Sequence, residues 1–206
     1  RIGDEAMRQQ ALSCMRNIME NSMNPDSGLP YDACNDGKWS NKGWWYDTLP
    51  VPGHSSYLCG QAMFYVLKAY EYEKSMANCV HGEWLPHVRN ILEKVEQTKN
   101  SDHEYPYIFS EKTGAGLEYD SFGGTWCLAA LAYYSWLSGD LSHMEGMKKS
   151  EKHYYNAFVR RMECYGTPLD TCKAMDSEGI LAYIKAVRFI HAITQDDLYL
   201  EHMKDA

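Results

Sequence analysis

Two stretches of the sequence repeat one another, and this repeat constrains the fold more than any other feature. One begins at Asp120 and the other at Asp176, each followed by Ser, and a second aspartate, Asp140 or Asp196, comes 20 positions later in both. A looser third copy begins at Ser55. The copies start 56 and about 65 residues apart, which exceeds the ~34 to ~47 residues of the common helical repeats. This spacing predicts a helical hairpin with a long loop at one end.

Helical periodicity of the apolar residues dominates the chain. The pattern predicts helices over residues 4–21, 55–74, 83–98, 121–137, 141–163 and 177–193, and a final helix from about residue 195. The only strand candidate, and a weak one, is 105–110. Loops, two of them rich in aromatic residues, separate these helices at 28–53, 105–119 and 164–175.

The predicted helices are of two kinds. The helix at 121–137 is apolar almost all round, with no charge between Cys127 and Tyr134, whereas the helices at 83–98 and 141–163 carry many lysines and glutamates. A helix that is apolar all round is buried, so we expect inner and outer helices to alternate around an axis. The sequence therefore predicts an all-α fold, an α/α toroid built of three to four hairpins, in a single domain over residues 1–206.

Charge and composition exclude several classes of function. A net charge of -8 without a Lys/Arg cluster argues against nucleic-acid binding. No apolar run approaches the ~20 residues that span a membrane. We expect neither a nucleic-acid nor a membrane partner, and localisation and oligomeric state stay open. Because the chain starts at Arg1 and stops inside a helical pattern, we expect a fragment of a longer chain.

Cysteines and histidines give no metal motif. Seven cysteines occur at irregular spacings without CxxC, so free thiols are favoured. Cys164 and Cys172 flank a Gly-Thr-Pro loop and are the one candidate pair for a disulfide. Eight histidines form no HExxH motif and no paired spacing. We therefore expect no metal and no other cofactor.

Three segments together resemble a known family. They are PGHSSYLCGQAMFYVLKAYEYEK, EYDSFGGTWCLAALAYYSWLSGD and KAMDSEGILAYIKAVRFIHAITQD. With the aromatic loop before the first of them, they resemble the six-hairpin glycosidases, the (α/α)6 barrel enzymes. The resemblance covers most of the chain and rests on architecture and small-residue patterning. A complete six-hairpin barrel is longer than this chain, so the resemblance implies a partial barrel and a glycoside hydrolase acting on an oligo- or polysaccharide.

Enzymes of this kind use two carboxylic acids. One protonates the leaving oxygen, while the other activates water or attacks the anomeric carbon. The candidate acids lie at the starts of predicted inner helices or in the loops before them: Asp47, Glu118, Asp120, Asp176 and Glu178. Asp120 and Asp176 also suit helix N-caps, and Glu178 lies in a first turn, where acids are common for structural reasons.

Aromatic rings pack against the apolar faces of sugars. The candidate substrate-binding residues lie in the loops and at the helix starts: Trp39, Trp44, Trp45, Tyr46, His54, Tyr107, Tyr119 and Trp126. The tryptophan cluster fits equally well as a plug for the end of the barrel.

Three other functions are alternatives to hydrolysis. A polysaccharide lyase would use a Tyr, His or Lys base in place of the acid pair. A non-catalytic helical module would bind glycan or protein through the aromatic loops. A terpenoid-type toroid would carry a DDxxD or DxDD motif, and the sequence has neither.

Overall fold

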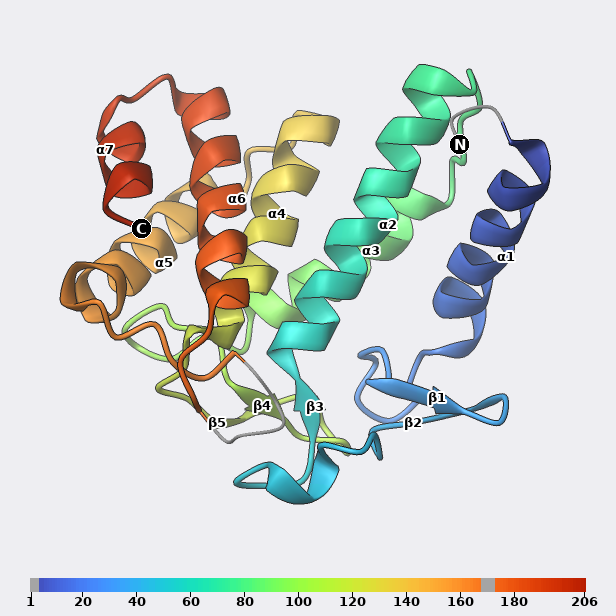
Figure 1. Ribbon diagram of the computed structural model, residues 1–206, viewed down its shortest axis with the longest axis horizontal. Coiled ribbons are helices and arrows are strands. Elements are labelled where there is room, and N and C mark those ends of the chain that lie inside the picture. Colours follow the sequence, from blue (N-terminus) through green and yellow to red (C-terminus); the bar gives the residue numbers. More distant parts are fainter. Residues whose placement is uncertain (1–3, 168–172) are drawn as a thin grey trace.

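The computed structural model describes residues 4–167 and 173–206 (Figure 1). The described chain is mostly helical, as predicted. Its helices are α1 (Glu5–Asn21), α2 (Ser56–Met76), α3 (Trp84–Glu96), α4 (Thr125–Ser138), α5 (Met144–Ala157), α6 (Ser177–Thr194) and α7 (Leu198–Asp205). Short 3-10 turns are η1 (Tyr46–Thr48), η2 (Phe122–Gly124) and η3 (Val159–Arg161). Within the described residues, no helix combines the length and apolar character needed to cross a bilayer.

Two small antiparallel sheets correct the all-α prediction. β1 (Ala33–Asn35) pairs with β2 (Lys38–Ser40), and β3 (His54–Ser55), β4 (Ile108–Phe109) and β5 (Gly116–Glu118) form a sheet in the order β3-β4-β5. The candidate at 105–110 contains β4. The other strands were missed because strands of two or three residues are too short to show an alternating pattern.

Helices α2, α4 and α6 lie side by side, with α4 in the middle (Figure 1). Every residue of α4 from Thr125 to Ser135 is buried. Helix α3 packs against α2 and α4, α5 packs against α4 and α6, and α7 packs against α6. Contacts therefore join α3, α5 and α7 to the row formed by α2, α4 and α6.

Small and aromatic residues bring the inner helices together. A Cβ atom at Gly60 of α2 would overlap the backbone of α4 at Trp126 and Cys127, so only glycine allows this close approach. Farther along, the Tyr133 ring of α4 stacks on the Phe189 ring of α6 with centroids 4.4 Å apart. Burial of such large rings is the main source of stability in a helical core.

The sequence repeat corresponds to a repeated turn from an inner to an outer helix. α4 ends at Gly139 and α6 at Gln195, and both residues are left-handed, with φ of 76° and 57°. The aspartate that follows, Asp140 or Asp196, accepts a hydrogen bond of 3.0 Å from the backbone N–H two residues later. The second aspartate of each copy thus shapes a turn.

The beginnings of the two copies differ. Asp176 caps α6, as expected, and accepts hydrogen bonds from two backbone N–H groups of its first turn. At the other copy, Ser121 caps η2, so the expectation that Asp120 is the N-cap is corrected. The described cysteines Cys14, Cys34, Cys59, Cys79, Cys127 and Cys164 are free thiols. Cys172 lies outside the described residues, so the predicted candidate pair Cys164–Cys172 does too.

Candidate functional site

The first turns of the three inner helices meet at the end of the molecule that also carries the β3-β4-β5 sheet (Figure 1). Tyr57 in α2 donates its hydroxyl hydrogen to Oε2 of Glu178 in α6. The Tyr57 ring also lies 6.3 Å from the ring of Trp126 in α4, in an edge-to-face arrangement. These three side chains therefore link α2, α4 and α6 at one point.

A second carboxylate, that of Glu118, is bound by Lys173. The Lys173 ammonium donates to Oε1 of Glu118 and to the carbonyl of Tyr119, both at 2.8 Å. It also lies 5.8 Å from the centroid of the Tyr107 ring, and Tyr107 packs in one apolar cluster with Tyr57. We call Tyr57, Glu118, Trp126, Lys173 and Glu178 the rim site.

The other three predicted acids are placed differently. Asp120 is exposed, has a φ of 59°, and accepts a hydrogen bond of 2.6 Å from the hydroxyl of Tyr165. Asp176 is used as the cap of α6. Asp47 is exposed on η1, in a different loop from the other four acids. Asp120 and Asp176 thus lie beside the rim site, each two residues from one of its glutamates, whereas Asp47 lies in another loop.

The predicted tryptophan cluster is only partly exposed. Trp44 is 77% exposed, and its ring stands edge-on to that of Trp45 at 5.7 Å. Trp45 packs against the apolar cluster around Tyr107, and Trp39 is half-buried in β2. Trp44 is the one tryptophan of this loop whose ring is free enough to accept a sugar face.

Several predicted binding residues are instead used by the protein itself. His54, Tyr107 and Trp126 are 0%, 0% and 3% exposed, so their rings present no free face, and we leave them out of any stacking subsite. The hydroxyl of Tyr119 donates to the carbonyl of Thr98 at 2.6 Å. The hydroxyl of Tyr46 donates to a carboxylate oxygen of Glu111 at 3.2 Å. Sequence patterning could not separate these packed rings from free ones.

A buried polar network links the turn after α1 to β3. Nε2 of His54 contacts the Ser27 hydroxyl at 2.8 Å and the Asn24 amide at 3.2 Å. Burial lowers the pKa of His54 to about 4, against the opposing effects of Glu111 and the Pro30 carbonyl. The imidazole is therefore neutral at pH 7, and its role is structural.

Two buried carboxyls were missed by sequence reasoning. Asp32 accepts a hydrogen bond of 2.7 Å from the N–H of Ser55, and burial raises its pKa well above the usual value. Burial also raises the pKa of Glu104, which accepts from the N–H of Ser121 at 2.9 Å. Both acids accept a hydrogen bond from a backbone N–H just before an inner helix, so they fix the start of that helix.

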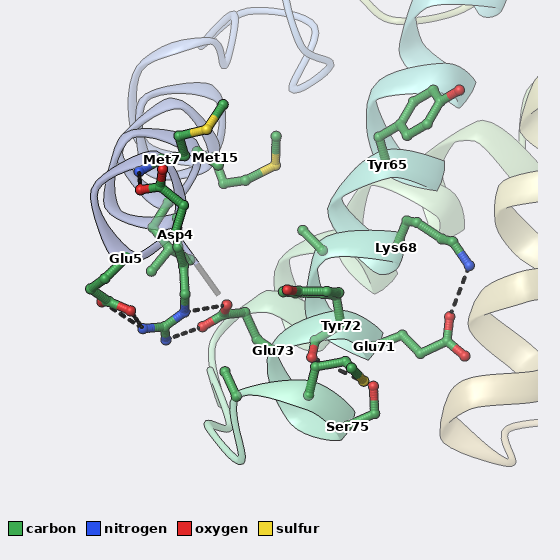
Figure 2. A pocket seen from close by; sticks show the side chains of 16 residues that line it. Asp4, Glu5, Met7, Met15, Tyr65, Lys68, Glu71, Tyr72, Glu73 and Ser75 are labelled. Carbon is green, nitrogen blue, oxygen red and sulfur yellow. Dashed lines mark hydrogen bonds and ion pairs between the residues drawn. The ribbon is translucent and has the colours of Figure 1, made fainter. Parts of the chain in front are cut away.

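A groove with a volume of about 1090 Å³ lies away from the rim, between α1 and α2 (Figure 2). Figure 2 shows Met7 and Met15 of α1 on one side and Tyr65 and Tyr72 of α2 on the other. The acids of this groove are engaged in caps or ion pairs, such as Arg8 with Glu73 at 2.6 Å. The groove is thus mainly apolar and holds no unengaged carboxylate pair.

The rim site also contains residues that the sequence analysis did not select. Tyr57 could have been found from its place in the first turn of the third repeat copy. Lys173 had no signal, because its partner Glu118 lies 55 residues away in the chain. The same holds outside the site for Tyr165, whose partner Asp120 lies 45 residues away. No protein-family model matches this chain, and none of the curated proteins does either.

Proposed function

We propose that this chain carries the substrate rim of a glycoside hydrolase acting on an oligo- or polysaccharide, and that its hairpins form part of an (α/α)6 toroid. The observation that carries the proposal is the contact of Tyr57, Trp126 and Glu178 at the starts of three inner helices. The contacts of α3, α5 and α7 with the row formed by α2, α4 and α6 support the toroid.

Glu178 and Glu118 are the proposed carboxyl pair. Each accepts a hydrogen bond from a side chain anchored elsewhere in the fold, Tyr57 for Glu178 and Lys173 for Glu118. Such partners fix the direction of a carboxylate, which is a requirement for attack on an anomeric carbon or for activation of water. Asp120 is the reserve candidate because it is exposed two residues from Glu118.

Trp44 is the proposed platform for a more distant sugar unit. Its ring is largely exposed and is held edge-on by Trp45. An aromatic ring fixed in this way binds an apolar sugar face with little loss of side-chain entropy.

A non-catalytic glycan-binding module is the second candidate. The specific observation in its favour is that both rim glutamates already hold a protein donor, so they serve as hydrogen-bond acceptors in a rigid surface. In that case the rim binds glycan through the same residues without bond cleavage.

Hydrolysis of a broad glycan panel, measured by release of reducing ends, tests the proposal. We expect the wild-type chain to cleave one class of glycan and Glu118→Gln to lose most of that activity, while Asp47→Asn, an exposed acid in another loop, retains it. Binding without cleavage in calorimetry would favour the second candidate. An ultraviolet-absorbing unsaturated product would identify a lyase instead.

A further inference from the structure

The chain segment after α2 folds back onto the last turn of that helix. The backbone N–H groups of Ala77 and Cys79 both donate to the carbonyl of Glu73, at 3.2 and 2.9 Å. Asn78 between them has a φ of 51°, a left-handed value that asparagine tolerates. This tight turn brings Cys79 and His81 next to the Glu73 side chain.

Three different ligand atoms converge there. Nε2 of His81 lies 3.1 Å from Oε2 of Glu73, and Sγ of Cys79 lies 3.7 Å from the same His81 nitrogen. All three atoms lie within 4.8 Å of one another. A tetrahedral zinc ion with bonds of about 2.0 to 2.3 Å holds its donor atoms roughly 3.3 to 3.7 Å apart. The two separations that involve His81, 3.1 and 3.7 Å, are therefore close to those of a filled site, and the separation of the Glu73 and Cys79 atoms does not exceed 4.8 Å.

The surrounding contacts orient these ligands. The His81 ring stacks on Trp84 with centroids 4.3 Å apart and planes inclined by 12°. Glu73 is 2% exposed, and the guanidinium of Arg8 holds it through both oxygens at 2.8 and 2.6 Å. Partners of this kind restrict the motion of the ligating side chains.

Both oxygens of Glu73 accept from Arg8, Oε1 from Nε and Oε2 from a terminal guanidinium nitrogen. A carboxylate oxygen has two lone pairs, so a metal on Oε2 would use the second lone pair, on the side of His81. Cys79 and His81 are half-buried, which leaves the pair accessible, and Glu73 lies on the wall of the groove in Figure 2.

We propose that Glu73, Cys79 and His81 form a binding site for a divalent metal of borderline softness, with Zn²⁺ as the best match. A ligand set of one sulfur, one nitrogen and one oxygen suits zinc or cobalt and disfavours magnesium and calcium, which prefer oxygen. Binding converts the Cys79 thiol to a thiolate and releases its proton to solvent. His81 coordinates through Nε2 and carries its proton on Nδ1. Three protein ligands leave one position for water or a further ligand.

This site was not expected from sequence, because Cys79-x-His81 alone matches no paired metal motif. The third ligand comes from the end of α2, and only the fold-back of the turn brings it close. Among residues 4–167 and 173–206, it is the only group of three such side chains with this geometry.

Titration of the full chain with Co²⁺ tests the proposal, because a thiolate ligand gives a sulfur-to-cobalt charge-transfer band in the near ultraviolet. We expect one Co²⁺ per chain, a charge-transfer band, and displacement by Zn²⁺ with loss of the band. Cys79→Ser should abolish the band, and both Cys79→Ser and His81→Gln should weaken metal binding by more than ~100-fold, beyond the usual effect of a supporting residue.

Cys14→Ser is the matched control, since Cys14 is an exposed thiol on α1 outside the cluster. It should leave the band and the affinity unchanged, and far-ultraviolet circular dichroism should show the same helix content in every variant. A band that persists in Cys79→Ser, or wild-type protein without a band in excess Co²⁺, would overturn the proposal.

Discussion

Acid should destabilise this protein through His54. Its folded-state pKa is lowered to about 4 by burial, whereas histidine in an unfolded chain titrates near about 6.5. Between these values the unfolded chain binds a proton that the folded protein does not. The stability that depends on the neutral ring is therefore fully present above pH ~6.5 and is lost as the pH falls toward ~4.

The size of the effect follows from the separation of the two pKa values. One pH unit corresponds to about 1.4 kcal/mol, so lowering the pH from 7 to 5 removes about 2 kcal/mol of unfolding free energy through His54. Burial acts in the opposite direction on Asp32 and Glu104, whose raised pKa values favour proton binding by the folded state. The contribution of His54 must therefore be isolated by substitution.

Urea unfolding of the wild type and of His54→Gln at pH 7 and pH 5 isolates this contribution. Glutamine is long enough to place its amide oxygen near the Nε2 position, where it can accept from Ser27, and it does not titrate. We compare the difference in unfolding free energy, wild type minus variant, at the two pH values. This difference should be about 2 kcal/mol smaller at pH 5 than at pH 7. Parallel pH dependences in the two proteins would refute the assignment of a buried neutral imidazole.

Three further predictions concern stability. Gly60→Ala should lower the unfolding free energy by about 1 to 3 kcal/mol, because the added methyl group overlaps the α4 backbone. Gly82→Ala, with open space around the added Cβ, is the control and should leave the unfolding free energy unchanged. Equal denaturation midpoints for the two variants would contradict the close helix contact. Asp176→Ala should lower the unfolding free energy by about 1 kcal/mol through loss of the α6 cap, and Asp47→Ala is the exposed control. Thermal melts of the two variants measure the difference. An Asp176→Ala protein as stable as the wild type would argue against the cap. Asp32→Asn should stabilise the protein at neutral pH and not at pH 3, since burial raises the carboxyl pKa; a stability gain equal at both pH values would contradict that reasoning.

The starts of two inner helices were predictable. The helices predicted at 55–74 and 177–193 begin within one residue of α2 and α6, where Ser55 and Asp176 accept N–H hydrogen bonds. An almost wholly apolar stretch such as α4 has few alternatives to burial, so its inner position was also predictable.

The strands and the site were harder to predict for different reasons. Pairing of His54 with Phe109 joins residues far apart in the chain, and each strand is too short to give a local signal. The Tyr57–Glu178 hydrogen bond spans 121 residues. Such contacts depend on how the helices pack, which a single sequence does not specify, so the acids could be proposed but their partners could not.

The most direct test of the account is the rate of glycan hydrolysis by Glu178→Gln. The wild-type chain, this variant and Asp47→Asn would be compared on the glycan that the panel identifies as cleaved, with equal helix content verified for each. If the rim site carries the chemistry, Glu178→Gln loses at least ~100-fold in rate, the usual scale for acid–base catalysis, and Asp47→Asn retains full activity. A Glu178→Gln protein that cleaves glycan at the wild-type rate would contradict the assignment of hydrolysis to this rim.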